Sequence, residues 1–153
     1  MSLSSLYVRD FAIVRKIELE LEHGLTVVTG ETGAGKSIMI DALDLVLGAR
    51  GDSSTIRHGA DSAEVLAGFE LEAGGDAAGW LCAHELEDEG GCVLRRIVYR
   101  DKPTKAFIND RPVTVQTLRD LGDLRKLGIH TADQSAPYVL FDGRRLAQQL
   151  ALF

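Results

Sequence analysis

Residues 30–37 read GETGAGKS and combine the residue types that hold nucleotide phosphates. Their spacing fits GxxxxGK[ST], because the loop glycines are followed directly by Lys36 and Ser37. Glycines allow successive backbone N–H groups to turn inward toward phosphate oxygens. The Lys36 ammonium would reach the β- and γ-phosphates, and the Ser37 hydroxyl would take one position on Mg²⁺. The residues expected to contact the nucleotide are Gly30, Glu31, Thr32, Gly33, Ala34, Gly35, Lys36 and Ser37.

Two elements must position this loop, and both occur where they are needed. Residues 25–29 are a continuous, mostly β-branched run, typical of a parallel strand buried on both faces. Residues 37–47 carry the apolar pattern of a largely buried helix, and Gly48 is a natural stop for it. The start of that helix would add partial positive charge beside the phosphates. A chance glycine-rich turn is the alternative, but strand, loop and helix together predict an ATP or GTP site.

Nucleotide binding does not by itself define the activity, because such loops serve kinases, GTPases, motors and DNA-handling ATPases. Hydrolysis also requires a carboxylate at the end of a second strand to hold Mg²⁺. Asp142 follows the apolar run 138–141 and is a candidate, but a turn before the last helix explains Asp142-Gly143 as well. Asp41 and Asp44 on the first helix are expected to face solvent or a neighbouring loop.

The rest of the chain predicts an α/β fold that includes antiparallel strands. Residues 17–22 alternate apolar and acidic side chains, as in a strand with one face in water. Asn109-Asp110 has the composition of a tight hairpin turn, and Thr114 is a good N-cap. Further strands are expected at 63–72, 93–99, 105–108, 111–113 and 127–130, helices at 115–125 and 144–153, and a short exposed helix or loop at 80–89.

Composition and charge limit the classes of function. The 153 residues suffice for one globular domain, with 45% apolar and 26% charged residues. The net charge of −6 argues against a surface that is basic all round, but residues 95–126 hold nine basic and four acidic side chains. Cys82 and Cys92 form no CxxC pair, so we expect reduced thiols. No signal peptide and no apolar run of about 20 residues is visible, which makes a cytoplasmic location the default.

An ordered set of motifs resembles the RecN family, bacterial DNA-repair ATPases of the SMC-like ABC group. An apolar strand is followed by Arg9-Asp10-Phe11, and GETGAGKSI is followed by DAL and by LGAR at 47–50. Arg57-His58-Gly59 then fits an R-x-G segment, and paired arginines at 95–96 precede FINDRPV at 107–113. The resemblance covers nearly the whole chain. It implies a P-loop NTPase fold, the first lobe of an ABC/SMC-type ATPase head with an antiparallel β subdomain.

The resemblance also implies that residues 1–153 are the amino-terminal part of such a head. Family members continue into a long coiled coil and a carboxy-terminal half with the signature motif and the Walker B Asp-Glu, which we expect to be absent here. ATP hydrolysis, with ATP and Mg²⁺ as cofactors, is then expected only in the longer protein and not in the isolated chain. The implied partners are that carboxy-terminal half, a second head in an ATP-dependent dimer, and DNA during recombinational repair of double-strand breaks. No membrane is involved, and the location would be cytoplasmic and nucleoid-associated.

Further site residues follow from the same resemblance. Arg57 would lie close to the nucleotide and link it to DNA, and Arg9 would line the same pocket; for both, a solvated surface arginine is the alternative. A His-x-Gln-His segment in the family places a glutamine at Mg²⁺ and the attacking water. His130 fits this segment, but Ala132 stands at the glutamine position, so either catalysis is impaired in this member or the two segments align with a shift. Gln134, which could substitute only if the loop were rearranged, is the catalytic candidate beside Lys36.

The basic residues of the second half could form a DNA-facing surface. Arg95, Arg96, Lys105 and Arg111 would contact backbone phosphates, without sequence preference and with a strong dependence on salt. The alternative is a solvated hairpin face that protects an exposed sheet edge.

Two other functions stay open at this point. A stand-alone small P-loop kinase would need catalytic arginines and an acceptor site, for which Arg144-Arg145 and Asp142 are candidates. A non-enzymatic interaction module with a relic P-loop is the third possibility.

Overall fold

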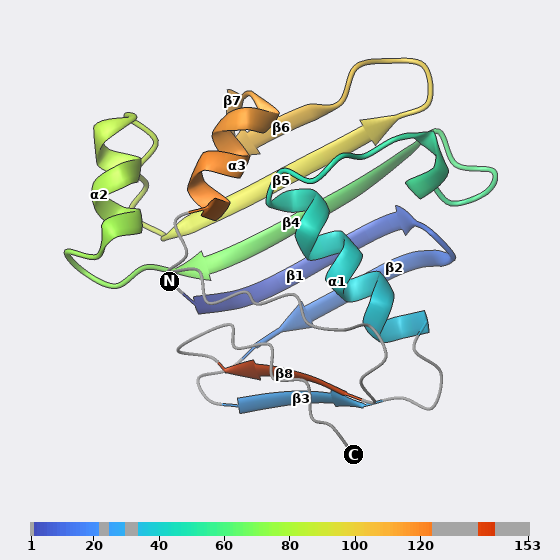
Figure 1. Cartoon of the computed structure of the whole chain (residues 1–153), viewed down its shortest axis with the longest axis horizontal. Coiled ribbons are helices and arrows are strands. Elements are labelled where there is room, and N and C mark those ends of the chain that lie inside the picture. Colours follow the sequence, from blue (N-terminus) through green and yellow to red (C-terminus); the bar gives the residue numbers. More distant parts are fainter. Residues whose placement is uncertain (1, 22–24, 30–33, 124–137, 143–153) are drawn as a thin grey trace.

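A six-stranded antiparallel sheet is the largest part of the structure, a computed structural model that describes residues 2–21, 25–29, 34–123 and 138–142. Its strands follow the order β2-β1-β4-β5-β6-β7 (Figure 1). They are β1 (Ser2–Phe11), β2 (Val14–Glu20), β4 (Ser62–Glu70), β5 (Cys92–Tyr99), β6 (Lys105–Ile108) and β7 (Arg111–Val113). The predictions at 63–72, 93–99, 105–108 and 111–113 are confirmed to within two residues.

Two local sequence patterns also have the expected structure. In β2, Ile17 and Leu19 are half-buried while Glu18 and Glu20 are exposed, which is the alternation of an edge strand. Between β6 and β7, Asn109 and Asp110 both have positive φ, 49° and 62°. That is the backbone of a type I′ turn, so the predicted hairpin is confirmed.

One face of the sheet carries the core, and two helices cover it. The register places Val8, Val65 and Ala67 on this face with Leu94 and Ile108, and all are fully buried. Helix α1 (Ala34–Val46) packs on β4 and β5, and helix α3 (Val115–Asp123) packs on β6. Figure 1 shows both helices in front of the sheet. The predicted helix at 37–47 is confirmed, and the one at 115–125 is confirmed over residues 115–123, the part that the structure describes.

Helix α1 ends in a Schellman motif. Gly48 has φ +101°, its N–H bonds the Leu45 carbonyl at 3.1 Å, and the Ala49 N–H bonds the Asp44 carbonyl at 2.9 Å. The turn lies directly against α3, because a Cβ on Gly48 would be 2.8 Å from the backbone nitrogen of Arg119. Both the left-handed backbone and this close approach require glycine here.

A second, two-stranded sheet corrects one prediction. β3 (Leu25–Thr29) leads toward α1, but its described partner is β8 (Tyr138–Asp142), and the two strands are antiparallel. The β-branched composition predicted a parallel strand, and composition records burial rather than strand direction. The register pairs Thr29 with Tyr138 and Leu25 with Asp142.

The connections differ from expectation in one further respect. Helix α2 spans Asp76–Ala83, and Leu81 on it is fully buried, so this segment is half in the core rather than wholly exposed. The polar segment after α1 holds a 3₁₀ turn, η1 (Ser53–Thr55), and Ile56 bridges to Phe11. The strand expected at 127–130 and the helix expected at 144–153 lie outside the described residues.

Candidate functional site

The start of α1 is positioned for phosphate binding. β3 ends at Thr29 and α1 begins at Ala34, and its first turn contains no acidic residue. The first backbone N–H groups of a helix have no intrahelical partner and carry partial positive charge, so they stabilise an anion placed there. Ser37 lies in this turn and is partly exposed. Its hydroxyl is a ligand type that suits Mg²⁺, and the helix terminus suits phosphates.

The remaining residues of the phosphate motif are only partly covered by the structure. Gly30, Glu31, Thr32 and Gly33 lie outside the described residues. Ala34, Gly35 and Lys36 are described as backbone of the first turn of α1. Farther along, α1 is anchored in the core by its buried side chains. The buried side chains of α1 are Ile38, Met39, Ile40, Ala42, Leu43, Leu45 and Val46.

Arg57 is held at the end of β1 by Asp10. Its Nε donates to Asp10 Oδ1 at 2.9 Å, and its backbone N–H donates to the Asp10 carbonyl at 2.8 Å. The Arg57 side chain is 35% exposed, so it is paired with Asp10 but still accessible to solvent. Arg100 fixes the following loop by donating to the carbonyls of Arg57 and Ala60, at 3.2 and 2.7 Å. The pairing with Asp10 escaped sequence reasoning, because 47 residues separate the partners.

Arg9 lies on the sheet face opposite to α1. Val8 is buried on the α1 side, and alternation turns Arg9 to the other side. There its Nη2 is 3.1 Å from Glu64 Oε2, and the other oxygen of Glu64 accepts from Arg95 Nε at 2.5 Å. Glu64 is only 7% exposed, so one buried carboxylate joins the two arginines. The structure therefore brings Arg9 together with the proposed DNA set rather than with the start of α1.

The four residues predicted to face DNA do not share one surface. Arg95 and Lys105 lie on the face away from α1, where Arg95 stands over the Phe107 ring and Lys105 over the Tyr99 ring. Arg111, in β7, donates to the Glu85 carbonyl beyond α2.

Arg96 is the exception that requires a correction. It is 2% exposed and points toward α1, so it does not belong to a DNA-facing surface. Successive residues of a strand point to opposite faces, and this rule alone separates Arg95 from Arg96.

The pairing of β8 decides the role of Asp142. Because β8 is antiparallel to β3, Asp142 lies beside Leu25, whereas Tyr138 lies beside Thr29 and the phosphate motif. The four residue steps from Tyr138 to Asp142 span about 13 Å of strand. Asp142 therefore sits at the wrong end of β3 to act as the second-strand carboxylate. Gln134 lies outside the described residues.

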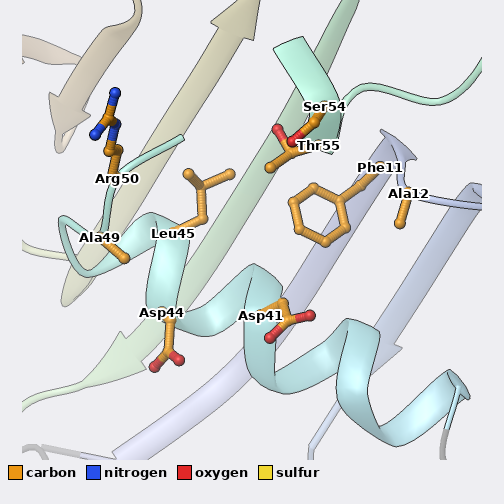
Figure 2. Close-up of a pocket in the computed structure, with 9 residues that line it drawn as sticks. All are labelled: Phe11, Ala12, Asp41, Asp44, Leu45, Ala49, Arg50, Ser54 and Thr55. Carbon is orange, nitrogen blue, oxygen red and sulfur yellow. The ribbon is translucent and has the colours of Figure 1, made fainter. Parts of the chain in front are cut away.

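A shallow pocket of about 360 Å³ opens beside α1, lined in part by Phe11, Asp41 and Asp44. Burial raises the pKa of Asp41; for Asp44, burial first and then the charge of Asp41 raise the pKa to about 6. Figure 2 shows Asp44 and Arg50 pointing away from each other, so the polar groups of this pocket do not converge on one ligand. Asp41 is exposed and Asp44 partly exposed at the rim of this pocket, which agrees with the prediction that they face solvent or a neighbouring loop.

Other kinds of site find no support in the part of the chain that the structure describes. Its His, Cys, Asp and Glu side chains form no group of three that could hold a metal ion. Cys82 is exposed and Cys92 is buried, and both are free thiols, as predicted. None of the described helices is long and apolar enough to cross a membrane.

Comparison with known proteins gives consistent matches. The family model of the AAA domain matches residues 5–144. DNA repair protein RecN of Xylella fastidiosa is 52% identical over 119 residues, which cover 78% of this chain and 21% of that protein. DNA repair protein RecN of Haemophilus influenzae is 43% identical over 141 residues, 90% of this chain and 25% of that protein. The chain thus spans about a quarter or less of the length of these relatives.

A solved structure from work on the "ATP-driven dimerization and DNA stimulated activation of SMC ATPases" has the same fold. It superposes with a TM-score of 0.64 at 27% identity, over 79% of this chain and 77% of that one. The fold is therefore that of a P-loop ATPase head lobe of the SMC type, with an antiparallel β subdomain.

Proposed function

Because the chain belongs to the AAA domain family, in its RecN branch, we propose that it is the ATP-binding lobe of a DNA-repair ATPase. The observation that carries this proposal is the order β3, GETGAGKS, α1, with a helix start that holds no carboxylate. Backbone N–H groups and Lys36 would bind the phosphates, and Ser37 would hold Mg²⁺. Bound Mg²⁺ would neutralise phosphate charge.

The other residue roles are parts of the same proposal. Arg57 is the cation proposed to reach the nucleotide, since its side chain is about one-third exposed and its guanidinium is oriented by Asp10. Gln134 is proposed to act near the attacking water, because the chain enters β8 at Tyr138, beside the end of β3. Arg9 is not proposed to contact the nucleotide directly, because it pairs with Glu64 on the sheet face opposite to α1.

The proposed DNA contacts lie on the sheet face away from α1. Arg95 and Lys105 belong to it, together with Lys102, which stands over the Tyr99 ring from the β5–β6 loop. Such cations would bind backbone phosphates without sequence preference, and binding would weaken with salt. Arg111 is proposed as a separate contact at the sheet edge, because it pairs with Ile108 and so does not share the face of Arg95 and Lys105, and Arg96 is not part of the set.

The remaining partners are proposed from the relatives. The solved SMC structure concerns ATP-driven dimerization and DNA-stimulated activation. By analogy, this lobe would join the carboxy-terminal half of its own head and then engage a second head when ATP is bound, acting in recombinational repair of DNA breaks.

The kinase alternative is disfavoured by one specific observation. It would use Asp142, but the antiparallel pairing puts this residue beside Leu25, at the end of β3 far from the phosphate motif. The relic alternative differs from the proposal in predicting no nucleotide binding at all.

The test is MgATP binding and turnover by the 153-residue chain, alone and joined to a carboxy-terminal head half from a RecN protein. Lys36→Ala is the loss-of-function variant, and Lys16→Ala, a lysine of the edge strand β2, is the matched control. We expect binding that Lys36→Ala abolishes, and turnover only in the joined form. Strong turnover by the chain alone, or binding that is indifferent to Lys36→Ala, contradicts the proposal.

A further inference from the structure

The buried guanidinium of Arg96 is attached to the far end of the P-loop helix. Its Nη1 donates to the carbonyls of Leu45 and Ala49, at 3.2 and 3.3 Å. Its Nε donates to Thr104 Oγ1 at 2.8 Å, and that hydroxyl donates to the Ile97 carbonyl at 2.9 Å. One arginine therefore ties the end of α1 to β5 and to the segment before β6.

A second arginine holds the same helix end from the other side. Arg119, on α3, donates from Nη2 to the Gly48 carbonyl at 3.1 Å. Helices α1 and α3 approach closely here, as a Cβ on Gly122 would lie only 3.1 Å from the Leu47 carbonyl oxygen. Arg96 and Arg119 together donate hydrogen bonds to the carbonyls of Leu45, Gly48 and Ala49. We call this pair of arginines the arginine clamp.

The clamp does more than terminate the helix. The Schellman motif already supplies backbone N–H partners to the carbonyls of Leu45 and Asp44, so α1 would end at Gly48 without it. Burial, and next the charge of Arg119, lower the pKa of Arg96. The charged form of Arg96 is therefore less stable here than in water. The negative end of the α1 dipole offsets part of that cost. What the guanidiniums add is a fixed position of the helix end relative to the sheet and to α3.

We propose that Arg96 and Arg119 are positioning residues for nucleotide binding, which they support by fixing the orientation of α1. This inference rests on the proposed nucleotide-binding function. A helix of 13 residues is a stiff rod about 20 Å long. A sideways shift of its last turn therefore moves its first turn by a comparable amount when the helix pivots in the core. Phosphate contacts at the first turn depend on that placement.

The experiment compares five variants of the 153-residue chain, of which Arg119→Met and its combination with Arg96→Met test the second arginine. Arg96→Met removes the charge and the hydrogen bonds while keeping a long apolar side chain, and Arg96→Lys keeps the charge but loses the planar fork. Arg15→Met, on the exposed side of β2, is the matched control. MgATP affinity is measured by calorimetry and the folded fraction by circular dichroism. The hydrogen-exchange rates of the Ile38, Met39 and Ile40 backbone amides are measured as well.

For folded protein, we expect about ten-fold weaker MgATP binding in Arg96→Met, an intermediate loss in Arg96→Lys and no change in Arg15→Met. Exchange at Ile38–Ile40 should be faster in both Arg96 variants than in the control. Adding Arg119→Met to Arg96→Met should weaken binding by less than the product of the single effects, because both arginines hold one helix end. If Arg96→Met does not fold, Arg96→Lys carries the test.

The inference is overturned if folded Arg96 variants bind MgATP like wild type, or if their Ile38–Ile40 amides exchange like those of Arg15→Met. Loss of MgATP binding in the wild-type chain itself would count against the proposed function instead. In that case the exchange measurement still decides whether Arg96 holds the first turn of α1.

Discussion

Replacement of Asp44 by asparagine should stabilise the protein at neutral and alkaline pH but not at acid pH. Asp44 lies in the last turn of α1, half-buried and close to the negative end of the helix dipole. Burial first, and then the charge of Asp41, raise its pKa from 3.8 to about 6 in the folded state. The unfolded chain binds this proton less tightly, so ionisation of Asp44 opposes folding. The penalty is absent below about pH 4, grows between about pH 4 and 6, and is complete above that range.

The size of the effect follows from the same pKa. A rise to about 6 corresponds to about 3 kcal/mol if the carboxylate were fully shielded from water. The side chain is only partly buried, and screening by solvent reduces the expected value to about 1 kcal/mol. Asp44→Asn should therefore raise the free energy of unfolding by about 1 kcal/mol at pH 8 and leave it unchanged at pH 4.

Urea denaturation followed by circular dichroism at several pH values between 4 and 8 measures this difference. Asp101→Asn is the matched control, because Asp101 lies exposed in the β5–β6 loop, and it should show no such pH dependence. An Asp44→Asn variant that is no more stable than wild type at pH 8 would refute the reasoning. So would a stabilisation of equal size at pH 4 and pH 8, since the gain would then not come from the charge.

Three further expectations concern stability and reactivity. Gly48→Ala should lower the free energy of unfolding by about 2 kcal/mol in urea titrations, because it combines a left-handed backbone with a contact to Arg119; an unchanged midpoint would contradict this. Glu64→Gln removes a buried carboxylate that pairs with two arginines, and should lower the free energy of unfolding by about 2 kcal/mol in the same assay. An unchanged free energy of unfolding would show that the two ion pairs do not stabilise the fold. A thiol reagent should label Cys82 at once and Cys92 only as the chain unfolds, because Cys92 is fully buried and burial raises its pKa to about 12; equal labelling rates in the folded protein would refute this.

The sequence predicts local features of this fold well. The spacing of GETGAGKS, the helix that follows it and the stop at Gly48 are all set by residues within one turn or loop. The hairpin at Asn109-Asp110 is equally local, because its two positive φ angles need only two suitable residues.

The features that sequence reasoning missed depend on distant partners. The direction of β3 is set by β8, whose residues come about a hundred positions later, and composition carries no record of that pairing. Asp10 and Arg57, and likewise Arg96 and the end of α1, meet only through the sheet order. Arg95 and Arg96 are an intermediate case, since strand alternation predicts their opposite directions once β5 is recognised.

The same β3–β8 pair has a consequence for the order of folding. Four of the five strand pairings in the six-stranded sheet join strands that are consecutive in the chain, the exception being β1 with β4, and all five lie within residues 2–113. β3 must instead wait for residues 138–142, which are synthesised about a hundred positions later. On a ribosome, the antiparallel sheet can therefore be complete while β3 still lacks its neighbour. The strand that leads into the phosphate motif is then secured late, on a scaffold that has already formed.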